Sequence, residues 1–168
     1  GKIREAHIPR TGKKLGAFDY DSLELRAFAQ ACFDLFGESV MLDLINQGKD
    51  IHAWMGAKLL SIDENREIPY EEMMDMLKGG DKKATAKHYR QMAKAANFGF
   101  PGGLGAPKFL DYLKGYGVTG ISLKKSKEIR TAFYEAFPEM RKFFDWHKIS
   151  EDAQGFWHYD TLGRWRAN

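Results

Sequence analysis

Apolar residues recur along most of the chain at the spacing of one helical face. Between residues 23 and 36 they occupy positions 23, 25, 28, 29, 32, 33, 35 and 36, which is a broad helical face. The same spacing, together with N-cap residues such as Asp50 and Asp81, predicts seven further helices. They are expected over approximately residues 39–45, 50–60, 69–77, 81–98, 105–114, 122–136 and 138–152.

Short apolar runs at the two ends of the chain predict strands. Residues 15–18 follow a turn signal and lead to Asp19, and residues 155–161 contain three aromatic side chains. The expected fold class is therefore mainly α, with α+β character at the ends. Because such short strands are not stable alone in water, we expect the other strands of their sheet to lie outside this chain.

Composition narrows the class of protein. The chain has 168 residues, of which 43% are hydrophobic and 29% charged, as is typical of one globular domain and not of a disordered chain. No run of 18 apolar residues is present, and no apolar stretch follows the N-terminus, so we expect neither a membrane segment nor a secretory signal. The single cysteine excludes an internal disulfide and is compatible with a reducing cytoplasm.

Charge is segregated along the chain. Residues 34–75 contain 10 acidic and 3 basic residues, whereas residues 78–94 contain 1 acidic and 6 basic residues. A basic block beside an acidic one suggests a surface that faces a polyanion. A solvated helix face is the alternative interpretation.

Three segments carry residues suited to nucleotide chemistry. Asp19, at a predicted strand end, could bind Mg²⁺, although such a residue is also a common turn former. Arg90, Lys94 and Phe98 recur at every fourth position, so two cations and an aromatic ring share one helix face that suits phosphates and a base. The alternative is a surface helix with Phe98 in the core. His52, near a helix N-terminus, could donate to phosphate or serve a structural role.

In combination, these segments resemble one known family. Residues 19–26 (DYDSLELR) resemble motif A, D-Y-S-Q-I-E-L-R, of family A DNA polymerases, the bacterial DNA polymerase I-like enzymes. Residues 50–52 (DIH) resemble the D-I-H that follows it, and residues 90–99 (RQMAKAANFG) resemble motif B, R-x-x-x-K-x-x-N-[FY]-G. Residues 133–138 (FYEAFP) are similar to the family's Y-F-x-x-Y-P. Residues 161–164 (TLGR) are similar to T-L-x-G-R, with one residue fewer.

The resemblance implies part of a DNA-directed DNA polymerase, a nucleotidyltransferase of DNA replication. Residues 1–26 would contain a palm strand and motif A, and residues 27–154 would form the helical fingers subdomain. Within the fingers, residues 61–80 would be an insertion and residues 81–98 would correspond to the family's O helix. Residues 155–168 would return as a strand toward the palm.

The resemblance also implies catalytic and triphosphate-binding roles. Asp19 would be a catalytic residue and one of two Asp ligands of a pair of Mg²⁺ ions, with Tyr20 supplying a backbone carbonyl ligand. Arg90, Lys94 and His52 would contact the triphosphate of the incoming dNTP, and Lys94 would be the acid for the leaving pyrophosphate.

Five further positions are implied to contact the sugar, the base or the nucleic acid. Glu24 would be the steric gate that crowds a ribose 2′-OH, and Phe98 would stack beside the nucleotide. Arg164 and Arg26 would contact the nucleic acid or support the site. Gly102 stands where the family usually has the Tyr that packs under the template base.

The expected partners are a dNTP, primer–template DNA, and the remaining palm and thumb of a longer polymerase, and no membrane. Motif C, with the second metal-binding Asp, would follow residues 163–164 and is not found before Asn168. Only half of the two-metal site is then present, so we expect this chain alone not to polymerise DNA. The Phe-Pro-Gly-Gly run at 100–103 resembles phage enzymes more than cellular ones, which would place the protein in the host cytoplasm.

Two alternatives stay open from the residues. One is a non-catalytic helical module that binds nucleic acid through the basic block, which would leave Asp19 and Glu24 unexplained. The other is a relative of the single-subunit RNA polymerases, which a bulky carboxylate at Glu24 disfavours because it obstructs ribonucleotides.

Overall fold

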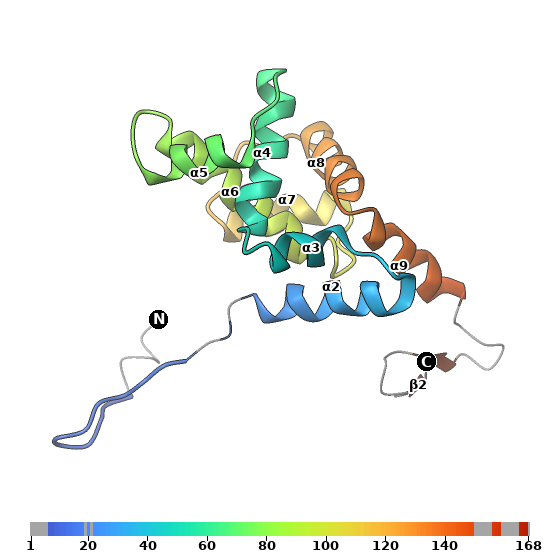
Figure 1. The fold of residues 1–168 in the computed structure, drawn as a ribbon, viewed down its shortest axis with the longest axis horizontal. Helices are drawn as coiled ribbons and strands as arrows, with labels where there is room; N and C mark the ends of the chain where they lie inside the picture. Colours follow the sequence, from blue (N-terminus) through green and yellow to red (C-terminus); the bar gives the residue numbers. More distant parts are fainter. Residues whose placement is uncertain (1–6, 19, 21, 150–155, 159–164, 168) are drawn as a thin grey trace.

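The computed structural model describes residues 7–18, 20, 22–149, 156–158 and 165–167, and this part of the chain contains eight helices. The helices are Leu23–Phe36 (α2), Val40–Asn46 (α3), Ile51–Glu64 (α4), Tyr70–Lys78 (α5), Lys83–Gly99 (α6), Ala106–Gly115 (α7), Leu123–Ala136 (α8) and Pro138–Ile149 (α9). Figure 1 shows the helices gathered in one body, from which the N-terminal segment extends away. None of these described helices has the length and apolarity that a membrane crossing needs.

Helices α4 and α6 form the most extensive helix pair of the fold. Apolar and small residues surround much of α4, so this helix is buried on several sides and not on one stripe. The two backbones approach closely at Gly56, where an added Cβ would lie 3.2 Å from the backbone nitrogen of Arg90. Gly56 therefore sets the position of the middle of α6, including Arg90, against α4.

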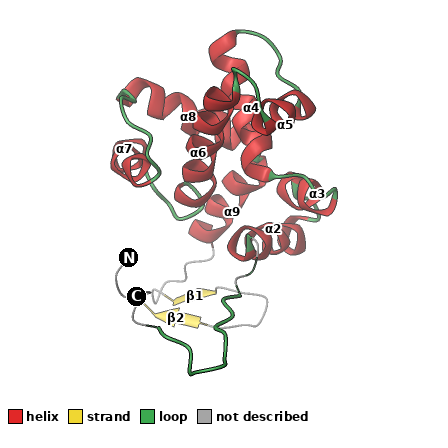
Figure 2. Ribbon diagram, turned by 90° about the vertical axis from the view of Figure 1, so that its left-hand side faces the viewer, coloured by secondary structure: helices red, strands yellow, loops and turns green. Residues whose placement is uncertain are grey.

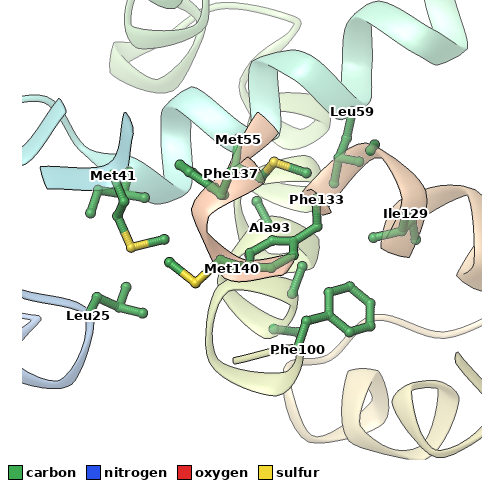
Figure 3. Packing of buried hydrophobic residues seen from close by; sticks show 14 of the residues in the cluster. Leu25, Met41, Met55, Leu59, Ala93, Phe100, Ile129, Phe133, Phe137 and Met140 are labelled. Carbon is green, nitrogen blue, oxygen red and sulfur yellow. The ribbon is translucent and has the colours of Figure 1, made fainter. Parts of the chain in front are cut away.

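The main core lies between α4, α6 and the helices around them. Figure 3 shows Phe100, at the end of α6, beside Phe133 of α8. Their ring centroids are 5.4 Å apart, and Phe109 of α7 lies 4.4 Å from Phe100. Such tilted pairs are favourable beyond their buried area. This aromatic cluster fixes the C-terminal end of α6 in the protein.

A buried carboxylate joins the two ends of the chain's helical part. Glu139, in the first turn of α9, is 2% exposed and accepts hydrogen bonds from the Ser39 hydroxyl (3.0 Å) and the Met41 amide (2.9 Å) at the start of α3. Cys32 of α2 is fully buried in the same cluster. The hydrogen bonds hold the start of α3 against α9, which is about 100 residues later in the chain, and the apolar cluster that contains Cys32 joins α2 to them.

Helix α5 packs on a second, smaller cluster. Met73 and Met76 of α5 are buried against Ala53, Ala57 and Leu60 of α4, with Ile68 and Ala86 completing the group. The segment 61–80, which we expect to be an insertion, thus adds its own apolar contacts beside the α4–α6 pair.

Two helix boundaries differ from those predicted. Helix α4 runs to Glu64, four residues beyond position 60, because Asn65 takes the left-handed conformation that ends it (φ 50°). Asp81 does not cap α6: the chain turns at Gly80, Lys83 N donates to Gly80 O, and Lys82 occupies the N-cap position without a side-chain cap. The other helices begin within one or two residues of their predicted starts.

The predicted strand over residues 15–18 is not formed. These residues have no strand partner in the described part of the chain, and Phe18 is 97% exposed. An isolated strand lacks partners for its backbone hydrogen bonds, which explains the difference. In residues 155–168 the structure describes two three-residue strands, Phe156–His158 (β1) and Trp165–Ala167 (β2), which pair antiparallel (Figure 2). They pair only with each other among the described residues, so sheet strands shared by both ends are not confirmed.

Candidate functional site

A cleft of about 980 Å³ lies between the start of α2, the turn that leads into α4, and one face of α6. It brings together seven of the ten residues selected from the sequence, although they come from three separate segments. These are Tyr20, Glu24, Arg26, His52, Arg90, Lys94 and Phe98. Ser22, Leu23, Ala27, Ile45, Gly48, Lys49, Asp50 and Ile51 complete the lining.

The α6 side of the cleft presents Arg90, Lys94 and Phe98 on successive turns, as their spacing predicts. All three side chains are half-buried. Lys94 has no ion pair with a carboxylate in the described part of the chain, whereas Arg90 does. Among the described residues, one cation on this face is therefore paired with a carboxylate and the other is not.

Asp50 connects the start of α4 to α6. Its Oδ1 accepts the amides of His52 (2.9 Å) and Ala53 (3.0 Å), which is the N-cap that the sequence predicts. Its Oδ2 accepts Nε (2.9 Å) and Nη2 (2.8 Å) of Arg90. Burial raises the pKa of the Asp50 carboxyl, but the Ala53 amide and the Arg90 guanidinium lower it, and the net pKa lies below its ordinary value.

His52 is held by a residue of α6. His52 is 7% exposed, and its Nδ1 lies 3.0 Å from Nδ2 of the buried Asn97, which also donates to Ile51 O at 3.4 Å. With the amide nitrogen as donor, Nδ1 accepts, so the neutral ring carries its proton on Nε2. The His52 ring also lies 5.5 Å from the Phe98 ring. These contacts set the orientation of the ring at the edge of the cleft.

The α2 side of the cleft is more exposed. Tyr20 is 79% exposed, and Glu24 and Arg26 are also exposed. Glu24 stands in the first turn of α2. Ser22 enters the helix in the left-handed conformation (φ 52°), which is uncommon for a residue with a side chain. The backbone therefore bends sharply just before Glu24.

Three of the ten selected residues are not found in the cleft. Asp19 and Arg164 lie outside the described residues. Gly102 is described and exposed in the turn after α6, outside the cleft lining. A Cβ at Gly102 would lie 3.4 Å from Phe98 O, an ordinary contact, so the backbone there does not require glycine.

Sequence reasoning missed three contributors to the cleft. Asp50 was expected only as a cap, and Asn97 was part of the motif without a role. No role was predicted for Lys49. Its ammonium lies 5.4 Å from the centre of the Tyr70 ring. The Tyr70 hydroxyl accepts a hydrogen bond from the Asp50 amide at 3.0 Å. The D-I-H and motif B resemblances were the available signals for the first two residues, but spacing alone did not show that these segments meet.

The described residues do not by themselves form a metal centre. No group of three or more His, Cys, Asp and Glu side chains within them is arranged to hold a metal ion. Glu24 and Asp50 are the described carboxylates of the cleft, and Asp50 is already engaged by α4 and Arg90. A Mg²⁺ ion there would need Asp19 or oxygens brought by a ligand.

Comparison with known proteins identifies the family. DNA polymerase I of Aquifex aeolicus is 34% identical over 130 residues, 77% of this chain and 18% of that protein. DNA polymerase I of Chloroflexus aurantiacus is 24% identical over 144 residues (86% and 12%), and that of Synechocystis sp. is 25% identical over 155 residues (92% and 13%). The chain thus spans less than a fifth of the length of these relatives. No solved structure matches the chain significantly.

The match to the family's own sequence profile is more extensive. The profile of DNA polymerase family A covers residues 1–167. This range includes the cleft and all five segments whose motifs resemble that family. The chain therefore belongs to DNA polymerase family A.

Proposed function

We propose that this chain is the part of a DNA-directed DNA polymerase that binds the incoming dNTP with Mg²⁺ and positions it for template-directed phosphoryl transfer. The observation that carries the proposal is the cleft itself. Two cations, a histidine and an aromatic ring, from segments about 40 residues apart, line one cavity of about 980 Å³. That volume lies within the usual range of small-ligand sites.

The cations of α6 are placed to neutralise a triphosphate. Lys94 has no carboxylate partner in the described part of the chain, so its charge is available to an anion. Arg90 donates only Nε and Nη2 to Asp50, which leaves further N–H groups of its guanidinium for phosphate oxygens. Phosphoryl transfer depends mainly on such positioning and charge neutralisation. Lys94 is the residue that we propose as the acid for the leaving pyrophosphate.

We assign sugar and base selection to Phe98, on the same face of α6 as these cations, and to Glu24, on the α2 side of the cleft. Phe98 lines the cleft beside the His52 ring and offers a flat surface to the nucleotide. Glu24 projects from the first turn of α2 into the same cavity. We propose that Glu24 acts as the gate against a ribose 2′-OH, and that Phe98 in place of Tyr disfavours dideoxynucleotides.

Mg²⁺ would be held by Asp19 and the backbone carbonyl of Tyr20, together with phosphate oxygens of the dNTP. Mg²⁺ normally uses one or two carboxylates plus substrate phosphates, so the cleft does not need a complete protein cage. When bound, the ions supply charge neutralisation during phosphoryl transfer. The chain's own contribution is to place Arg90, Lys94 and His52 around the triphosphate.

Primer–template DNA and the palm and thumb of a longer polymerase are the proposed partners. Arg26 lines the cleft and is assigned to the nucleic acid, and Arg164 is assigned the same role from its motif. The phage type and the host cytoplasm as location stay predictions. A larger side chain would fit at Gly102, so the backbone does not explain why glycine replaces the family's Tyr there.

Calorimetric titration of dNTP with Mg²⁺ tests the proposal. Lys94→Ala should weaken binding at least about tenfold, as expected when one charge-assisted hydrogen bond to phosphate is removed. Lys87→Ala is the matched control, because Lys87 lies on α6, is exposed and does not line the cleft. Equal losses in both variants, or no binding to the unmodified chain, would contradict a triphosphate site on α6.

The same titration separates the alternatives. A non-catalytic nucleic-acid module would bind DNA with a steep salt dependence and would not respond to dNTPs. A relative of RNA polymerases would bind rNTPs as tightly as dNTPs. The family assignment and the position of Glu24 in the cleft favour the DNA polymerase.

A further inference from the structure

Lys49 lines the cleft, although it belongs to none of the segments whose motifs resemble the family. It is half-buried, and it has no ion pair with a carboxylate in the part of the chain that the structure describes. Its positive charge is therefore a component of the cleft to which the proposed function assigns no role.

The backbone of Lys49 is fixed on both sides. On its N-terminal side, Gly48 takes the left-handed conformation after α3 (φ 69°), and its amide donates to Ile45 O at 2.9 Å. The Lys49 amide donates to Leu44 O at 3.0 Å, which completes a Schellman motif. On its C-terminal side, Asp50 caps α4. Lys49 is thus the one residue between two capped helix ends, and its backbone cannot shift without disturbing a cap.

Tyr70, the first residue of α5, contacts both the cap and the Lys49 side chain. Its hydroxyl accepts a hydrogen bond from the Asp50 amide at 3.0 Å. In a capping box this amide is bound by a Glu or Gln three positions later, but that position of α4 is Ala53, so Tyr70 replaces it from another helix. The centre of the Tyr70 ring lies 5.4 Å from the Lys49 ammonium, a distance at which the ring attracts a cation.

Helix α5 holds Tyr70 firmly against α4. Met73 and Met76 of α5 are buried in the smaller apolar cluster, and Tyr70 packs half-buried beside the same cluster. The segment 61–80, which we expect to be an insertion, therefore reaches the cleft through Tyr70. Its contacts with Lys49 and with the cap are polar, so they are additional to the apolar packing that attaches α5.

The order of the residues along the cleft places Lys49 at one end. The Asp50 carboxylate lies on the Arg90 guanidinium, whereas the His52 ring lies beside the Phe98 ring. The segment that begins α4 thus runs from the Arg90 end of the cleft to the Phe98 end, and Lys49 precedes it at the Arg90 end. A nucleotide whose base and sugar lie at Phe98 extends its last phosphate toward Lys49.

We propose that Lys49 is a further dNTP-binding residue that contacts the terminal phosphate, and that Tyr70 is the positioning residue that holds it there. The assignment rests on the proposed function, because it takes a dNTP to be the occupant of the cleft. Asp50 offsets part of the positive charge of Arg90, so a further cation at this end strengthens the attraction for the terminal phosphate. The expected consequence is a preference for triphosphates over diphosphates.

Calorimetric titrations of dTTP and dTDP, each with Mg²⁺, test the proposal. Lys49→Ala should weaken dTTP binding at least about fivefold, as expected when one charge-assisted contact is lost, and should change dTDP binding by less than about twofold. Lys58→Ala is the matched control, because Lys58 is exposed on α4 outside the cleft lining and its ammonium lies 5.3 Å from the centre of the Trp54 ring. It removes a similar charge and a similar ring contact, and it should change neither affinity.

Two substitutions at Tyr70 separate its ring from its hydroxyl. Tyr70→Phe keeps the ring beside Lys49 and should retain the preference for dTTP over dTDP, whereas Tyr70→Leu should lower that preference at least about twofold. Added to Lys49→Ala, Tyr70→Leu should lower it no further, because both act through one contact. The ratio of the two affinities is the readout, since a partly unfolded sample affects both titrations equally. The same effect of Tyr70→Leu with and without Lys49 would overturn the positioning role.

The outcomes also separate this proposal from the proposed function. If dTTP binding depends on Lys94 but its ratio to dTDP binding is unchanged in Lys49→Ala, the role of Lys49 is overturned and the dNTP site is not. Equal losses for dTTP and dTDP in Lys49→Ala would show a general effect of charge and would overturn the assignment to the terminal phosphate. Failure of the unmodified chain to bind dTTP would overturn both proposals.

Discussion

On the wall of the cleft formed by α4 and α6, Arg90 and His52 are fixed by partners within the described residues, whereas most side chains on the wall formed by the start of α2 are exposed. Asp50 holds Arg90, and Asn97 holds His52. On the other wall Tyr20 is 79% exposed and Leu23 is 54% exposed. The comparison indicates that Arg90 and His52, two of the proposed phosphate-binding residues, are prearranged by contacts within this chain. Glu24, the proposed gate, is exposed and is held less firmly by packing.

Among substitutions that test the difference between the two walls, we expect Gly56→Ala to have the largest effect, because it disturbs the α4–α6 wall. The new Cβ would meet the Arg90 nitrogen and the Tyr89 carbonyl carbon, both at 3.2 Å, and would force α4 and α6 apart. We expect a loss of about 2 kcal/mol in the free energy of unfolding and weaker dNTP binding. Urea denaturation measures the first effect.

Gly115→Ala is the matched control for that substitution. Gly115 is helical, and nothing lies within 4 Å of an added Cβ. Here alanine should stabilise by up to about 1 kcal/mol, because it lowers the entropy of the unfolded chain. The same sign for both variants would contradict a close α4–α6 contact.

Asp50→Ala should have the next largest effect, about 1.5 kcal/mol of destabilisation, because it removes the α4 cap and leaves Arg90 without its partner. Asp50→Asn retains an oxygen that can cap and should cost about half as much. Thermal unfolding of the two variants checks the order. Equal costs would show that the cap contributes nothing beyond the ion pair with Arg90.

The Asp50 carboxylate should also make the free energy of unfolding depend on pH in the acid range. Because the folded pKa of Asp50 is lowered, its stabilisation is fully present above its unfolded pKa of about 3.9 and is lost as the pH falls through the folded pKa. The difference in free energy of unfolding between the unmodified chain and Asp50→Asn should therefore be constant near neutrality and shrink in acid. A difference that grows in acid would contradict the assignment.

The smallest effect is expected on the α2 wall. Glu24→Ala removes an exposed side chain at a helix start, so the free energy of unfolding should change by less than about 0.5 kcal/mol. The ratio of dNTP to rNTP affinity should fall, which parallel titrations with the two nucleotides measure. Loss of stability without a change in that ratio would assign Glu24 a structural role.

Local patterns predicted most of the helices because capping and spacing act within a few residues. Ser39 and Asp50 do cap the helices that follow them. The same reasoning failed at Asp81, where the turn at Gly80 already set the backbone, and at residues 15–18, where a strand needs a partner that local sequence does not provide.

Long-range partnerships were beyond local patterns. The stripe of Arg90, Lys94 and Phe98 follows from helical spacing, but the contact of Arg90 with Asp50 joins positions 40 residues apart. A second groove, outside the cleft, is a stronger case, since three of its lining residues, Gly103, Arg130 and Arg141, come from three segments and share no motif. Only the packing of α8 and α9 on the end of α6 brings them together.

Cys32 provides a chemical measure of how firmly α2 is attached. It is the chain's one cysteine and is fully buried, and burial together with the negative charge of Glu139 raises the pKa of its thiol to about 12. Since thiol reagents attack the thiolate, the folded chain should resist alkylation until α2 opens. When opening and reclosing are fast, the alkylation rate reports the free energy of that local opening. The alkylation rate of Cys32 therefore measures the opening of α2 separately from unfolding of the α4–α6 pair, and no cysteine has to be engineered into the chain.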